Sequence, residues 1–207
     1  MIAHDNTPEP MVNIELSPVM SWKEANSIAN DLIHNRYDYG MGLMIKIGIY
    51  SPLLISEILR LTWADLMTSD LKSVKGIENK KGQFIPFNKQ IRKDIVDVYH
   101  LYCEFNGNKL ELSEYVVVRK GEHQNSTQVG RFFAKLHKMY PMLQRPIKMA
   151  TLRATFGRRI LSQYGETPEV ISLLKTLLGQ ASSIGVRKAL FLDVLADDLS
   201  LESICTK

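Results

Sequence analysis

The sequence predicts a mainly α-helical domain with a small antiparallel β-sheet. Segments with apolar residues at helical spacing cover most of the chain. Two short extended stretches with a glycine between them lie between residues 71 and 87. The chain has 207 residues, of which 45% are hydrophobic and 23% charged, which is ordinary for one soluble globular domain.

The first expected helix begins at Ser21. Ser21 and Glu24 have the spacing of a capping box, in which the serine hydroxyl and the glutamate carboxylate each accept an N–H that the helix start leaves free. Ala25, Ile28 and Leu32 then share one face, and the helix is expected to reach Asn35.

Two more helices are expected before residue 62, separated by a serine–proline pair. Residues 41–50 are apolar on nearly all sides, as in a buried helix, and are too few to span a membrane. Ser51 predicts a helix cap, and Pro52 predicts the first residue of a helix through Leu61, because a missing N–H costs nothing at that position.

An antiparallel hairpin and further helices are expected after residue 62. The hairpin comprises residues 71–78 and 83–87, with Gly82 supplying the positive φ that a tight turn needs. The run at 115–118 predicts a third strand. The helices are expected from their caps and apolar spacing over residues 88–105, 126–140, 151–165, 167–179 and 183–196.

The expected organisation is a flexible arm over residues 1–20, one domain over 21–196 and a tail over 197–207, with no room for a separate domain before residue 21. No signal peptide or membrane-spanning run is apparent, so we expect a cytoplasmic protein. Cys103 and Cys205 are expected to be free thiols, and nothing requires a metal or an organic cofactor.

Positive charge is concentrated in two blocks, although the net charge is only +4. Residues 72–93 hold seven Lys or Arg against one acidic residue, and residues 141–190 hold eight against two. Clustered cations predict a surface that faces a polyanion, because their fields add. The alternative is a set of solvated helix faces.

Three segments, in the same order as in a known enzyme family, carry a resemblance. The segments resemble sequence motifs of tyrosine recombinases, also called phage integrases. They are SPLLISEILRLTWADL, KKGQFIPF, and TLRATFG with LLGQASS. The resemblance runs from Ser21 to about Leu192 and implies the fold of that family's catalytic domain. It also implies double-stranded DNA as a partner.

The family's chemistry requires a set of reactive groups. A tyrosine attacks a DNA phosphodiester, two arginines stabilise the phosphoryl charge, histidines move protons, and a hairpin lysine protonates the leaving oxygen. Most of these positions are replaced in this chain. The first arginine falls on Leu54, the hairpin lysine on Lys80 or Lys81, the H-x-x-R pair on Ala150 and Arg153, the histidine after L-L-G on Gln180, and the nucleophile on Ala189 or Leu190.

The resemblance therefore predicts a tyrosine recombinase-like protein without enzymatic activity. We expect an accessory or regulatory DNA-binding protein in DNA recombination, integration or gene expression of a mobile element. Cations of phosphate-binding type are candidates for DNA contacts. They are Lys80, Lys81, Lys148, Arg153, Arg158, Arg159, Arg187 and Lys188.

Three alternatives stay open on the sequence alone. The chain could be an interaction module that docks on an active recombinase, or associates with itself, through its C-terminal helix. It could also be a divergent active recombinase whose nucleophile comes from elsewhere, such as Tyr37, Tyr140 or Tyr164. Arg153 could serve in a structural ion pair with Glu57 instead of binding phosphate.

Overall fold

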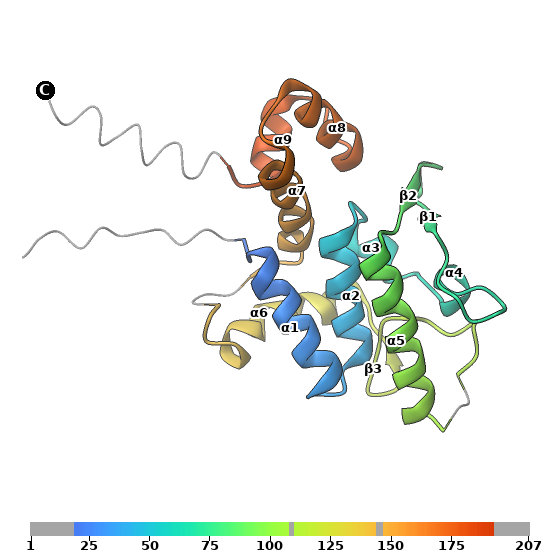
Figure 1. The fold of residues 1–207 in the computed structure, drawn as a ribbon. Helices are drawn as coiled ribbons and strands as arrows, with labels where there is room; N and C mark the ends of the chain where they lie inside the picture. Colours follow the sequence, from blue (N-terminus) through green and yellow to red (C-terminus); the bar gives the residue numbers. More distant parts are fainter. Residues whose placement is uncertain (1–18, 108–109, 144–146, 193–207) are drawn as a thin grey trace, which may run out of the picture.

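The structure is a computed structural model that describes residues 19–107, 110–143 and 147–192. Helices dominate it and the strands are short, which confirms the predicted class (Figure 1). The elements are α1 (Trp22–His34), α2 (Tyr39–Tyr50), α3 (Ile55–Ile58), α4 (Trp63–Leu66), β1 (Gly76–Glu78), β2 (Phe84–Pro86), α5 (Lys89–Phe105), β3 (Val118–Arg119), β4 (Glu122–His123), α6 (Ser126–Met139), α7 (Ala150–Tyr164), α8 (Pro168–Leu178) and α9 (Ser183–Ala189).

Helix α2 is the centre of the domain. Each of its residues is buried, as its apolar sequence predicts, and it packs against α1, α5 and α7. Glycines permit the close approach: a Cβ on Gly48 would lie 2.7 Å from Cδ1 of Leu152 on α7. A second, smaller apolar cluster joins α7, α8 and α9, which lie together at one end of the molecule (Figure 1).

Two of the predicted helix caps are confirmed and one is wrong. Ser21 forms the expected capping box with Glu24, and Asn88 accepts from the first turn of α5. Ser51, in contrast, donates its hydroxyl to Ile47 O of the preceding helix at 2.7 Å, so it ends α2 instead of opening the next helix. Pro52 then lies in a loop, and α3 has only four residues.

The strands form two separate two-stranded hairpins instead of one sheet. Ile77 is opposite Ile85 in the predicted β1–β2 hairpin, and Gly82 has the expected positive φ of 71°. The third strand, expected over residues 115–118, is β3 at Val118–Arg119. Tyr115 instead forms an isolated bridge with Thr62, and the two valines after it are buried in the core. Pairing with β4 starts at Val118.

The two ends of the described chain differ from expectation. Met20, placed in the flexible arm on sequence grounds, is buried, and its carbonyl accepts from the Thr155 hydroxyl at 2.8 Å. Helix α9 ends at Ala189, earlier than predicted. The rest of the arm, the last residues of the predicted helix and the tail lie outside the described residues. Among the helices that are described, none has the length and apolar character to cross a membrane.

A buried ion pair ties α2 to α5. Lys46 Nζ lies 3.1 Å from Asp94 Oδ2, and the two side chains are only 5% and 13% exposed. Gln90 donates to the other carboxylate oxygen at 2.9 Å. Breaking such a pair is costly because the remaining charge is left buried without its partner.

We predict that Lys46→Met destabilises the protein by about 3–5 kcal/mol, because the largely buried Asp94 carboxyl group loses its ion-pair partner. The double variant Lys46→Met with Asp94→Leu should recover most of this loss, since no unpaired charge remains. Urea unfolding of the single and double variants measures both effects. Equal stability of the two variants would contradict the interpretation.

A polar cluster connects α1 to the end of α6. Hydrogen bonds from Asn35, Arg36 and Tyr140 lower the pKa of Asp31 from 3.8 to about 2. Burial, together with the hydrogen bond to Asp31, raises the pKa of Tyr140 to about 12. The phenol donates to the carboxylate at 2.7 Å, so the cluster requires an ionised Asp31 and a neutral Tyr140.

The Asp31 carboxylate should therefore make stability depend on acid pH. Its pKa is lower in the folded than in the unfolded chain, so its stabilisation is present above about pH 4 and is lost as the pH falls through about 2. Asp31→Asn should flatten this part of the melting temperature against pH, whereas Asp97→Asn, at an exposed position of α5, should not. An unchanged acid dependence in Asp31→Asn would refute the assignment.

Candidate nucleic-acid interface

The α2–α3 loop, α7 and the end of α8 meet at Arg153. Its Nε donates to Pro52 O at 2.8 Å and its Nη2 to Leu177 O at 3.2 Å. The side chain is half-buried. Burial lowers the pKa of Arg153, and the nearby Glu57 carboxylate opposes that shift. The guanidinium therefore joins two backbone segments that are far apart in sequence.

Glu57 connects the β1–β2 turn to the same place. Its Oε2 accepts from the N–H of Leu54 at 2.7 Å, and its Oε1 accepts from the N–H of Lys80 at 3.0 Å. The carboxylate thus caps α3 and fixes the hairpin turn beside it. The turn follows from local sequence: Asn79 Oδ1 accepts from Lys81 and Gln83 N–H groups at 3.0 Å.

Of the two hairpin lysines, Lys81 is the one that reaches α8. A Cβ on Gly179 would stand 3.0 Å from Lys81 Nζ, and Gly179 has the left-handed backbone that ends α8. The backbone N–H of Lys80 donates to Glu57, so it is the backbone of Lys80 that is held at this site. Two cations, Arg153 and Lys81, therefore lie at the carboxyl end of α8, where unpaired carbonyl groups favour positive charge.

Leu190, at the predicted nucleophile position, is fully buried. It follows α9 and packs with Ala154, Leu174 and Val186. Its side chain fills the space over Gly157 on α7, where an added Cβ would lie 2.4 Å from Leu190 Cδ2. This position offers a hydrocarbon contact and no reactive atom.

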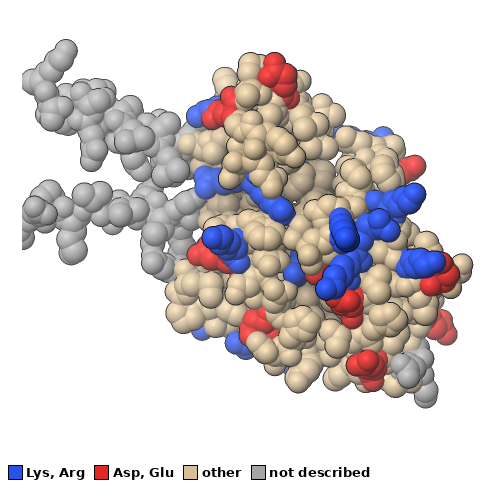
Figure 2. All heavy atoms as spheres, viewed as in Figure 1, with Lys and Arg blue, Asp and Glu red and all other residues tan. Residues whose placement is uncertain are grey.

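Basic side chains gather on the face that carries the β1–β2 hairpin and the start of α5 (Figure 2). The hairpin turn contributes Lys80 and Lys81, and α5 contributes Lys89 and Lys93, all exposed. Arg92 lies in the same turn of α5, and its Nε is buried with no hydrogen-bond partner among the described residues. The α5 cations were absent from the predicted contact set, although they belong to the basic block over residues 72–93.

Comparisons with known proteins identify the fold. A crystal structure described as XerA recombinase superposes with a TM-score of 0.60 at 16% sequence identity. The fold is that of a tyrosine recombinase. The match covers 89% of this chain and 61% of the other, so this chain spans less than two thirds of that recombinase's length. No protein-family model and no curated protein matches the sequence.

The tyrosine recombinase fold brings the predicted positions together around α7. Leu54 and Ala150 are exposed, at the starts of α3 and α7, and neither side chain carries a polar group. Gln180 is half-buried just after α8, and its amide donates to Leu178 O at 3.4 Å. Among the six positions of the family motif, the polar groups present are those of Arg153, Gln180 and the hairpin lysine.

The tyrosines considered as alternative nucleophiles lie in other surroundings. Tyr140 donates to Asp31 at 2.7 Å, and Arg36 lies 5.3 Å from its ring centroid. Tyr164 ends α7 and is exposed, as is Tyr37 between α1 and α2. Among the described residues, none of these three hydroxyls is hydrogen bonded to Arg153.

The three arginines of α7 do not form one surface. Arg153 points to α8, whereas Arg158 donates to Leu190 O and Phe191 O, both at 2.7 Å. Arg159 stacks on Trp22 and Tyr50, at 4.3 and 5.0 Å from their ring centroids.

The other described cations of the block over residues 141–190 either contact acidic groups of the protein or lie apart from one another. Arg187 of α9 forms an ion pair with Glu166. Lys148 and Lys188 are exposed, one before α7 and the other near the end of α9. Among the described residues of the block over 141–190, the arginines therefore form no single basic surface, because their guanidinium groups contact the protein itself.

Arg153 should contribute to stability whether or not DNA is present. Arg153→Lys keeps the charge but lacks the fork that donates to both carbonyls, so we predict a loss of about 1–3 kcal/mol in urea unfolding. Lys148→Ala, at an exposed position nearby in sequence, should change stability by less than about 0.5 kcal/mol. A loss no larger for Arg153→Lys than for this control would exclude the structural role.

Proposed function

We propose that this protein binds duplex DNA without cleaving it, as an accessory or regulatory factor in recombination, integration or gene expression of a mobile element. The observation that carries the proposal is the buried Leu190, which with Ala189 lies where the resemblance places the nucleophilic tyrosine; neither residue carries a hydroxyl. A hydrocarbon side chain cannot attack phosphorus, so covalent catalysis at this position is excluded by its chemistry.

The surrounding positions support the same interpretation. Leu54 and Ala150 supply neither the positive charge nor the proton transfer that strand cleavage requires. Arg153 donates to two backbone carbonyls, so an arginine at this position has a structural role that does not depend on catalysis. Loss of one charge-stabilising group typically lowers a rate by orders of magnitude, and several are lost together here.

Duplex binding is supported by the fold and by the basic face. Exposed lysines of the hairpin turn and of the start of α5 gather on one face (Figure 2), and the hairpin turn lies beside Glu57 and the end of α8. The exposed ammonium groups of Lys80, Lys81, Lys89 and Lys93 are free to approach a phosphate from solvent. Phosphate contacts of this kind give affinity that is independent of sequence and falls steeply with salt.

The decisive experiment combines a binding and an adduct assay on the same DNA. Duplex binding should weaken with salt, and Lys80→Ala with Lys81→Ala should lower the slope of log affinity against log salt by about 2, equally for unrelated sequences. Lys23→Ala with Lys138→Ala, two exposed lysines of α1 and α6, should leave the slope unchanged.

On a nicked suicide duplex, no covalent protein–DNA adduct should form. An adduct would show an active recombinase with a relocated nucleophile. No duplex binding at low salt up to micromolar protein would instead favour an interaction module that acts on another recombinase.

A further inference from the structure

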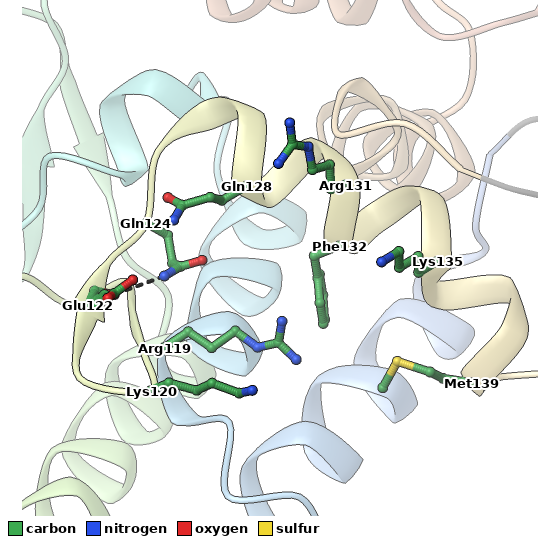
Figure 3. A pocket seen from close by; sticks show the side chains of 9 residues that line it. All are labelled: Arg119, Lys120, Glu122, Gln124, Gln128, Arg131, Phe132, Lys135 and Met139. Carbon is green, nitrogen blue, oxygen red and sulfur yellow. Dashed lines mark hydrogen bonds between the residues drawn. The ribbon is translucent and has the colours of Figure 1, made fainter.

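Two cavities adjoin the β3–β4 turn. The first has a volume of about 320 Å³ and lies between that hairpin and α6. Arg119 and Lys120 extend into it from the hairpin side, and Lys135 extends toward them from α6 (Figure 3). Arg131 and Gln128, one helical turn apart on α6, complete the polar wall. These side chains come from elements other than those that carry Arg153 and the β1–β2 turn.

The first cavity has an excess of positive charge that is held in place. Arg119 donates to Asp38 at 2.7 Å and lies 5.0 Å from the centroid of Phe132, so its guanidinium is fixed by a carboxylate and a ring. Lys120, Arg131 and Lys135 add three more cations, and among the described residues Glu122 is the one carboxylate that lines the cavity. Like charges gathered around one cavity favour an anion.

The second cavity is aromatic. It has a volume of about 640 Å³ and is lined by rings from the α1–α2 connection, the start of α2 and the end of α5. Tyr37 and Phe105 are 62% and 69% exposed. Both pack edge-on against the buried Tyr39, with ring centroids 6.3 and 5.9 Å away. The exposed rings are thereby held in fixed positions.

Backbone conformation maintains this arrangement. Tyr37 has a φ of 57°, a left-handed conformation that is unfavourable for a bulky residue and is kept only where the surroundings impose it. Lys120 and Gly121 also have positive φ, in the tight β3–β4 turn. Lys120 and Arg119 line both cavities, so a chain that leaves the aromatic cavity passes directly to the cations.

The ends of α1 and α5 lie at the end of the molecule opposite α8 and α9 (Figure 1). The paired cavities are therefore separate from the proposed duplex surface. A duplex stacks its bases internally and presents phosphates outward, so it would leave exposed rings unused. An unpaired strand offers both a base face and a phosphate at each nucleotide, and proteins bind such strands with aromatic rings beside cations.

We propose that this end of the molecule binds a nucleic-acid strand with unpaired bases. Bases stack on Tyr37 and Phe105, and the adjoining phosphates bind among Arg119, Lys120, Arg131 and Lys135. The DNA or RNA backbone supplies the same phosphate chemistry, so both are substrates to be compared. This site acts independently of the β1–β2 face, and it would give the protein a second nucleic-acid contact directed at melted or single-stranded segments.

Fluorescence anisotropy with labelled oligothymidylate and oligouridylate tests the proposal on the full chain. Tyr37→Asn with Phe105→Ser removes both rings, and Asn tolerates the left-handed backbone at position 37. Affinity should fall by about tenfold for each ring lost. Tyr37→Phe with Phe105→Tyr keeps both rings and should retain affinity. Lys120→Ala with Lys135→Ala should lower the salt slope by about 1.4.

The controls separate this site from the duplex face. Lys80→Ala with Lys81→Ala should leave oligothymidylate binding unchanged, and the ring variant should leave duplex binding unchanged. Unaltered strand affinity in the ring variant, at an unchanged melting temperature, would overturn the proposal. Displacement of the oligonucleotide by polyglutamate at lower concentration than by unlabelled oligothymidylate would also overturn it, because that result indicates an acidic peptide as the occupant.

Discussion

The guanidinium of Arg153 is the contact on which the arrangement of the site depends. It joins α7 to the α2–α3 loop on one side and to the end of α8 on the other, by donating to the backbone oxygens of Pro52 and Leu177. Glu57 lies beside it and holds the β1–β2 turn, and Lys81 from that turn faces Gly179. A positive charge placed between two carboxyl-terminal carbonyl groups and a carboxylate stabilises the junction electrostatically. The same positive charge would also attract a phosphate, so one property of the guanidinium accounts for both a structural and a DNA-binding role.

Local chemistry decided which parts of the fold were predictable. Ser21 and Asn88 cap helices through atoms two or three residues away, and the buried α2 is evident from its composition, so neighbours in sequence are sufficient to predict them. Ser51 has the same local pattern, yet its hydroxyl finds a carbonyl of the preceding helix first. The sequence does not decide between accepting an N–H of a following helix and donating to a carbonyl of the preceding one, because that choice depends on how the chain continues after Pro52.

The positions around α7 were predictable from the motifs, but the destinations of the charged groups were not. Arg158 and Arg159 are adjacent in sequence and differ by about 100° around the helix, so one meets the end of α9 and the other two aromatic rings. A count of charged residues along the sequence does not distinguish the surroundings of these two arginines. In the block over residues 72–93, in contrast, Lys80, Lys81, Lys89 and Lys93 remain exposed. Charge that is clustered in the sequence thus predicts an exposed basic face only where the charged side chains do not form contacts within the protein.

The contact between Leu190 and Gly157 has a consequence for any change at this position. The missing side chain of Gly157 leaves room on α7 that the buried, branched side chain of Leu190 occupies. Overpacking a filled core typically costs about 1–3 kcal/mol and moves the backbone. A Leu190→Tyr substitution would therefore crowd the face of α7 at Gly157, and the side chain at position 190 is set by this contact between α7 and the end of α9.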